Sequence, residues 1–146
     1  MRLQQGRMHW LTMLALVALV ALLVAVVLSG ATPASAASDF MLALARGDVD
    51  RLTDLSVLGE ETRGEMRSQW EFSTKVAAPN YRFTWTIGET RKQGANEAGV
   101  RIEMNSTPFS GDTTPDRFDL PLVKEGGKWK VHVQAINREF FPCLPR

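Results

Sequence analysis

The stretch Ala43–Leu55, ALARGDVDRLTDL, places a Gly-Asp pair inside an otherwise helical pattern of apolar residues. Residues from Ser38 to Arg46 carry apolar side chains at helical spacing, and Ser38 is a good N-cap for that helix. Gly47 can adopt the left-handed conformation that ends a helix, and Asp48 can cap a second one. The stretch therefore predicts a corner between two short helices whose apolar faces cover the same surface.

The rest of the chain predicts one more helix and then a run of strands. The third helix is expected from Glu60 to about Lys75, with Met66 and Trp70 on its apolar side. Four later segments alternate apolar and polar residues with the period of half-buried strands, and they cover 81–87, 99–105, 117–122 and 129–135. Short connections between consecutive strands favour an antiparallel meander. The prediction is an α+β domain with about three short helices on about four strands.

Pro121 restricts how the third of these strands can pair. Because proline has no N–H to donate to a ladder, its side of the strand is predicted to be an edge, an end or a bulge.

The N-terminal part of the chain contains an uncharged apolar run from Trp10 to Leu28. At about 1.5 Å per residue, this run nearly matches the thickness of a bilayer core. Arg2 and Arg7 precede it and no Lys or Arg follows before Arg46, so everything after Leu28 is predicted to be exported. We expect residues 1–36 to form a signal peptide or signal-anchor helix with a short linker, and residues 37–146 to form the folded domain.

The sequence leaves two fates open for this segment. Pro33 should end any helix, and Ala34-Ser35-Ala36 is an A-x-A pattern typical of a signal peptide cleaved after Ala36. The apolar run, however, exceeds the roughly 7–15 residues usual in a signal peptide, which favours an uncleaved anchor. The domain is thus expected outside the cytoplasmic membrane, either anchored in the membrane through residues 10–28 or released after cleavage near Ala36.

Charge and cysteine content bear on the class of function. The part after Ala36 loses only two of the 17 basic residues and keeps all 16 acidic ones, which gives a formal charge of −1. Nucleic-acid binding needs a basic stripe, so no nucleic-acid partner is predicted.

The single cysteine, Cys143, is interpreted as a small buried apolar residue, with a reactive thiol or intermolecular bridge as the alternative. No metal-binding or phosphate-binding motif occurs, so neither a metal nor a cofactor is predicted.

Two short segments resemble a known superfamily. Ala45–Asp48 is similar to its Ala-x-Gly-Asp helix corner, and Lys124–Val131 is similar to its Lys-x-x-Gly-x-Trp-x-Val hairpin. With the order of helices and strands, the chain from about Ser38 to Asn137 resembles the nuclear-transport-factor-2-like (cystatin-like) superfamily. The resemblance implies a curved sheet wrapped around helices as a cone, often with an apolar pocket at its mouth. Members include dehydratases, isomerases, ligand binders, dimeric scaffolds and membrane-tethered envelope proteins.

Aromatic residues on the inward side of the elements are the candidate pocket lining. They are Trp70, Tyr81, Phe83, Trp85 and Trp129. Glu103 and Asp119 fall on the outward side, where pairing with neighbouring Arg or Lys is expected. His132 also falls on the outward side and is interpreted as a solvated strand residue, with a general base as the alternative, so no catalytic residue is assigned. Phe140 and Phe141 would be exposed beyond the last strand, which makes them a candidate docking tail or, alternatively, a plug that closes the cone.

Three functions follow from these features. The leading hypothesis is an extracytoplasmic, non-enzymatic domain that binds a protein partner or itself in the cell envelope. The alternative is a small apolar ligand binder that uses a Trp-lined cone. A lyase or isomerase is the third, disfavoured because no acid or base is expected to face inward. A filled cone would favour the first function, a wide apolar pocket the second, and an inward titratable residue the third.

Overall fold

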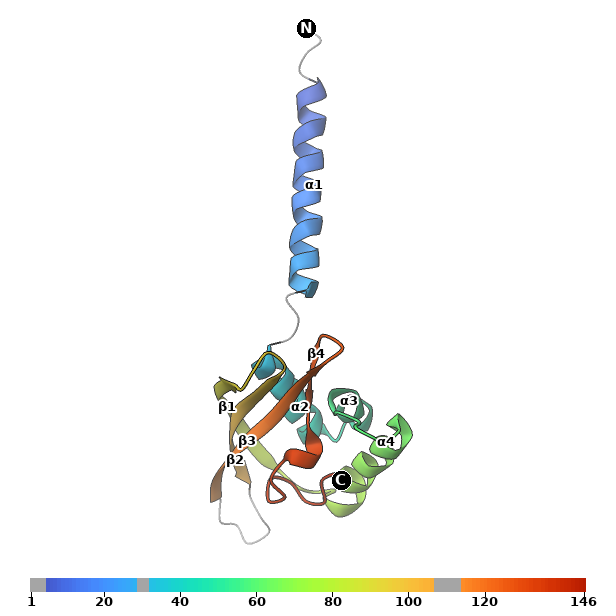
Figure 1. Ribbon diagram of the computed structural model, residues 1–146, viewed down its shortest axis with the longest axis vertical. Coiled ribbons are helices and arrows are strands. Elements are labelled where there is room, and N and C mark those ends of the chain that lie inside the picture. The colour runs from blue at the N-terminus through green and yellow to red at the C-terminus, as the bar shows by residue number, and fades with distance from the viewer. Residues whose placement is uncertain (1–4, 29–31, 107–113) are drawn as a thin grey trace. The chain divides into compact units, whose positions relative to one another are not determined.

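A computed structural model describes residues 5–28, 32–106 and 114–146 (Figure 1). The chain divides into two compact units, Met1–Gly30 and Ala31–Arg146. The first contains the helix α1, Gln5–Leu28. Judged on the described residues alone, no helix is long and apolar enough to cross a membrane. Arg2, which entered the prediction of export, lies outside the described residues.

The second unit begins with α2, Pro33–Arg46, which starts earlier than predicted. Thr32, not Ser38, is the N-cap, and its hydroxyl oxygen accepts a hydrogen bond from the Ser35 N–H at 3.2 Å. Pro33 begins the helix instead of ending one, because the first turn has no use for its missing N–H. Residues 32–36, which the sequence placed in the leader, are therefore part of the first helix of the domain.

The predicted helix corner is confirmed. Gly47 has a φ of +64° and ends α2 in the left-handed conformation, and the Asp48 N–H donates to the Ala43 carbonyl at 2.9 Å. The Asp48 carboxylate accepts from the Arg51 N–H at 3.0 Å and caps α3, Val49–Leu55. The Gly-Asp pair thus turns the chain between two packed helices.

The third predicted helix begins later than Glu60. In α4, Arg63–Glu71, the Thr62 hydroxyl accepts from the Glu65 N–H, and the Glu65 carboxylate accepts in return from the Thr62 N–H at 2.8 Å. The hydrogen bonds that the Thr62 N–H and hydroxyl donate to the Glu65 carboxylate hold the pKa of this carboxyl below its ordinary value. The helix then widens into the π-helix η1, Phe72–Ala77, which ends close to the predicted boundary.

The four predicted strands form one antiparallel sheet in the order β1-β2-β3-β4, as expected for a meander. The strands are β1, Phe83–Lys92; β2, Glu97–Ser106; β3, Thr114–Glu125; and β4, Lys128–Val131. β1 is longer than predicted because a bulge between Ile87 and Thr90 lets Thr90–Lys92 rejoin the ladder. β4 is shorter, because the chain turns into the short helix η2, Val133–Ala135.

Pro121 lies within β3, opposite Gly99 of β2, at the point where the pairing of β3 with β4 ends, which is one of the predicted alternatives. The β3–β4 ladder finishes at Leu122 and Val131, so β4 offers no ladder partner for the N–H that Pro121 lacks. Beyond that point only the His132 N–H approaches, and it donates to the Pro121 carbonyl at 2.9 Å.

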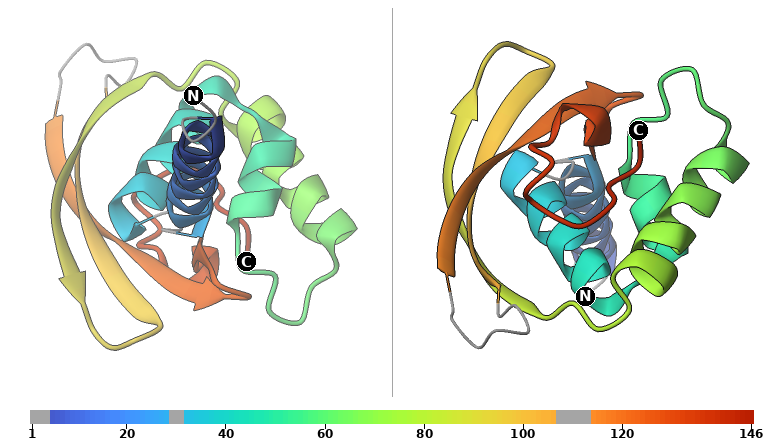
Figure 2. Two further views of the ribbon diagram at one scale, coloured as in Figure 1. Left: turned by 90° about the horizontal axis from the view of Figure 1, so that it is seen from above. Right: turned by 90° about the horizontal axis from the view of Figure 1, so that it is seen from below.

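The sheet curves around α2, and α3 and α4 lie on the other side of that helix (Figure 2). Side chains on the concave face of β2, β3 and β4 are buried, in agreement with the predicted alternation; they include Val100, Ile102, Met104, Phe118, Leu120, Leu122, Trp129 and Val131. The corresponding side chains of β1 are only half-buried. The fully buried core therefore lies between α2 and the last three strands, while the β1 side chains pack against its margin and stay half-buried.

Candidate functional site

The interior of the cone is filled by aromatic side chains from three parts of the domain. Phe40 of α2, Trp70 of α4 and Phe140 near the C-terminus are completely buried. The rings of Phe40 and Trp70 meet edge to face with centroids 5.7 Å apart, and Phe140 meets Phe118 in the same way at 5.2 Å. The space that a ligand would need at the centre is taken by the chain itself.

The C-terminal tail, Glu139–Arg146, fills the open end of the cone. Phe140 and Phe141 are buried, so the expectation that they would be exposed is wrong. Figure 2 shows the tail crossing the end of the domain between the sheet and α4. It is tied there by two hydrogen bonds: the Ser73 hydroxyl donates to the Cys143 carbonyl, and the Arg146 N–H donates to Gln69 Oε1 at 2.7 Å. Of the two roles considered for the tail, this arrangement is the one that closes the cone.

Buried polar side chains of the described residues are four hydroxyls, and each donates to the carbonyl four residues earlier; Ser73 also bonds to the Cys143 carbonyl of the tail. Thr53, Ser56 and Thr74 each donate to the carbonyl four residues earlier at 2.7 to 2.8 Å, and Ser73 reaches the Gln69 carbonyl at 2.9 Å. The Trp70 indole N–H donates to Ser56 Oγ at 3.0 Å. These hydroxyls are occupied by bonds to backbone carbonyls, so they satisfy buried polar groups within the fold.

The five candidate lining residues do not form one pocket. Tyr81, Phe83 and Trp85 stand in a row on the concave side of β1, with successive ring centroids 5.8 and 5.7 Å apart. Trp70 lies in the core behind them, and Trp129 lies at the β3–β4 hairpin, where Lys124 Nζ is 5.9 Å from its ring.

Phe141 joins the row from the tail, with its ring centroid 5.1 Å from that of Tyr81. The sequence gave no sign of this contact, because a residue in an irregular tail has no periodicity to follow. Tyr81 and Phe141 also line a surface pocket of about 340 Å³ beside Gly47 and Thr74.

Charged residues on the outer face of the sheet pair with one another, as predicted. Arg101 and Asp119 are direct cross-strand partners with Nη2 and Oδ2 3.1 Å apart, and Arg117 Nε lies 3.2 Å from Glu103 Oε1. The hydrogen bond and charge of Arg101 hold the pKa of the Asp119 carboxyl below its ordinary value. Both carboxylates are paired across the strands, which suits a solvated surface.

His132 is half-buried and lies outside the cone. It lines a pocket of about 380 Å³ beside the end of β4, together with Gln93, Asp119 and Pro121. Asp119 is committed to Arg101, so the pocket brings an imidazole near a carboxylate that is already paired.

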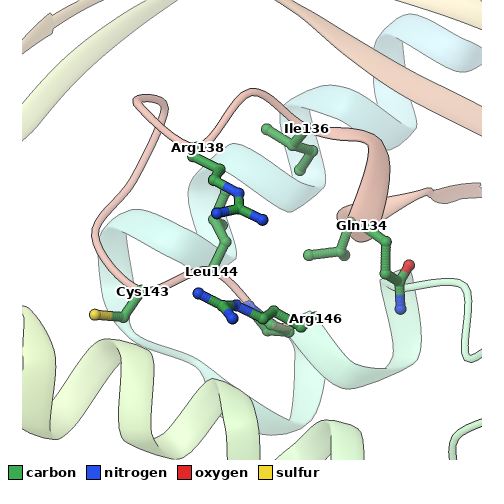
Figure 3. Close-up of a pocket in the computed structure, with 8 residues that line it drawn as sticks. Gln134, Ile136, Arg138, Cys143, Leu144 and Arg146 are labelled. Atoms are coloured by element: carbon green, nitrogen blue, oxygen red, sulfur yellow. The ribbon is translucent and has the colours of Figure 1, made fainter.

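Another pocket, of about 380 Å³, lies between η2 and the tail (Figure 3). The guanidinium groups of Arg138 and Arg146 extend over it, while the Cys143 thiol points away from them. Cys143 is exposed, so its interpretation as a buried residue is wrong. Its backbone has a φ of +52°, which turns the side chain outward while the neighbouring Leu144 packs against the core.

The described residues contain no group of three His, Cys, Asp or Glu side chains that could hold a metal ion. The pockets at η2 and beside β4 each include exposed residues in their lining, such as Arg138 and Arg146 in the first and Gln93 and Asp119 in the second, so each is open to water.

Comparison with solved structures identifies the fold. No protein-family model and no curated protein matches the sequence. The domain is similar to a protein assigned as a calcium/calmodulin-dependent protein kinase type II association domain from Thiobacillus denitrificans, with a TM-score of 0.52 and 14% identity, over 70% of this chain and 90% of that one.

Two further structures are similar at lower scores. A ketosteroid isomerase-like protein from Erwinia carotovora atroseptica has a TM-score of 0.48 and 18% identity, over 66% of this chain and 85% of its own. An NTF-2-like protein of unknown function from Shewanella oneidensis has a TM-score of 0.48 and 17% identity, over 66% and 88%. Identities this low speak for fold alone, since one fold hosts unrelated activities. The domain therefore has an α+β fold with a curved antiparallel sheet, which it shares with the Thiobacillus denitrificans protein.

Proposed function

We propose that the chain is a non-enzymatic domain of the cell envelope that binds a protein partner or a second copy of itself. The observation that carries the proposal is the filled interior, where Phe40, Trp70 and Phe140 occupy the centre of the cone. Small-molecule sites are concave volumes with a few converging polar groups. Here the tail occupies that volume and the buried hydroxyls bond to their own helices. The domain can therefore bind other molecules only at its surface.

A test with a small apolar probe separates this function from ligand binding. We expect indole to leave the melting temperature of the full-length chain in detergent unchanged, because the interior has no space for it. In the Phe140→Ala variant, indole should raise the melting temperature, since a truncated core side chain leaves an apolar cavity that such molecules fill. A clear rise in the wild-type chain would favour the ligand-binding alternative, whatever the variant does.

We also propose that the N-terminal segment keeps the domain attached to the outer side of the membrane. The proposal rests on the uncharged sequence from Trp10 to Leu28 and on the placement of Arg2 and Arg7 before it. The start of α2 supports attachment over cleavage. A cut after Ala36 would remove the Thr32 cap and the first turn of α2, and it would separate Ala36 from Ala37, both of which are buried.

Mass spectrometry of the chain from a membrane fraction checks this proposal. We expect an intact N-terminus and retention in the membrane after alkaline extraction, and a reporter fused after Arg146 should be active only on the outer side. A mature chain that begins at Ala37 would show that the A-x-A pattern is used and that the domain is released.

A further inference from the structure

β1 is an edge of the sheet, and only part of that edge is regular. Its inner side pairs with β2, and no described strand lies on its outer side. The bulge between Ile87 and Thr90 interrupts the ladder, so the regular part of the edge runs from Phe83 to Ile87. Bulges are a common device that ends an exposed edge. The segment available for pairing is therefore short, and its middle residue is Trp85.

The two faces of this segment differ in character. Phe83, Trp85 and Ile87 lie on the concave side and are half-buried, while Thr84 and Thr86 lie on the outer side and are exposed. The apolar row packs against the margin of the core, and part of each of these side chains stays exposed. Unpaired backbone groups next to half-covered aromatic rings form an edge that can accept another strand.

We propose that the β1 edges of two copies of this chain pair in an antiparallel manner about Trp85, so that two four-stranded sheets become one continuous sheet. In this register Trp85 faces Trp85 of the second copy, Phe83 faces Ile87, and Thr84 faces Thr86. Each pair joins side chains on the same face of the sheet, as antiparallel pairing requires. Aromatic and β-branched pairs, and threonine pairs, are favourable cross-strand neighbours.

Charge is also complementary in this register. Arg82 lies just before the regular edge and makes none of the ion pairs seen among the described residues. Glu89 lies just after it, paired only with the exposed Arg91 at 3.3 Å. Antiparallel pairing about Trp85 brings the Arg82 end of each copy to the Glu89 end of the other, and Arg91 and Lys92 lie farther along, past the bulge. Pairing in a parallel manner would place like charges together.

The inference rests on the proposed function, since it names the second copy as the partner of the binding domain. An interface of this length is small, and small interfaces give weak association in solution. If both copies are held in one membrane, the tether raises their effective concentration without any new contact. The fold itself limits the assembly to two copies at this edge, because each β1 has one free side.

Cysteine cross-linking of the full-length chain in detergent tests both the pairing and its register. In a Cys143→Ser background, a tagged Thr84→Cys chain is mixed with an untagged Thr86→Cys chain and mildly oxidised. Residues 84 and 86 of opposite copies would be direct neighbours with Cβ atoms about 4.5–5.5 Å apart, whereas 84–84 and 86–86 pairs would be diagonal at about 7–8 Å. The mixed dimer should therefore form at least several-fold faster than either like dimer.

An Arg117→Cys chain is the matched control, because that residue is also exposed on the outer face but lies on the inner strand β3. It should cross-link slowly. Equal rates for all combinations, or a mixed dimer no faster than the Arg117→Cys control, would overturn the proposal. A Thr84 or Thr86 cysteine that instead cross-links to a different protein in membranes would also overturn it, while leaving the proposed binding function in place. Binding of indole by the wild-type chain would overturn the function and not the pairing.

Discussion

Replacing Phe140 with alanine should lower the free energy of unfolding of the domain by about 3–5 kcal/mol. The ring is completely buried and packs edge-on against Phe118 with centroids 5.2 Å apart. Truncation removes the ring from apolar surroundings and leaves a cavity, because α2 and the sheet are held apart by the other core residues. Denaturant unfolding of the full-length chain in detergent, followed by tryptophan fluorescence, measures the change.

Phe72→Ala is the matched control, because it removes the same side chain from a position that is 52% exposed. Its effect should stay within about 0.5 kcal/mol. Deletion of the C-terminal tail should have a larger effect than Phe140→Ala, since it also removes Phe141 and the hydrogen bonds to Ser73 and Gln69. It should expose apolar surface to a dye as well. If the deletion left stability unchanged and instead abolished capture of a partner, the docking-tail hypothesis would be correct and the closed cone would not matter for stability.

The alternation of side chains along the strands was predictable, because burial on one face of a sheet imposes a period of two on the sequence. It placed Ile102, Leu120 and Val131 in the core and Glu103 and Arg117 in an ion pair outside it. The helix corner was predictable for a similar reason. Glycine is favoured at the left-handed residue that ends a helix, and aspartate is favoured as the N-cap of the next helix. Gly47 and Asp48 occupy these two positions in order.

Two helix starts were missed although local signals for them were present, and the burial of the tail could not be predicted from local patterns at all. The start of α2 was missed because Thr32 and Pro33 were interpreted as a linker, although a Thr-Pro pair is a valid helix start. The start of α4 was missed although Thr62 and Glu65 have the spacing of a capping box. Burial of Phe140 and Phe141 could not be read from a tail without periodicity, and the exposure of Cys143 depends on its positive φ.

The five candidate lining residues do not lie together, and the reason is geometric. Sequence phase says which face of a strand a residue lies on, but it does not say how far the helices extend over that face. Tyr81, Phe83, Trp85 and Trp129 lie on the concave side of the sheet, yet only Trp129 among them is buried. The row that continues along β1 packs only at the margin of the core, and its half-exposed rings make the edge a candidate surface for a second copy.

Trp70→Ala should also lower the free energy of unfolding by about 3–5 kcal/mol, and the same change at Trp85 should cost less. Trp70 is completely buried, packs against Phe40 with ring centroids 5.7 Å apart, and donates its indole N–H to Ser56 Oγ at 3.0 Å. Trp85 is only half-buried, so less apolar surface returns to water when it is truncated. Trp70→Phe keeps most of the apolar contact and isolates the loss of the hydrogen bond, which should cost about 1 kcal/mol.

The comparison of the two tryptophans depends on concentration if β1 pairs with a second copy. In a monomer Trp85 is partly in water, whereas in a β1-paired dimer it would be covered by Trp85 of the other copy. The cost of Trp85→Ala should then rise with protein concentration, because association of the wild type adds to its apparent stability. The cost of Trp70→Ala should rise very little, since Trp70 lies in the core of each copy. A Trp85→Ala cost equal to that of Trp70→Ala at every concentration would mean that β1 is covered within a single chain.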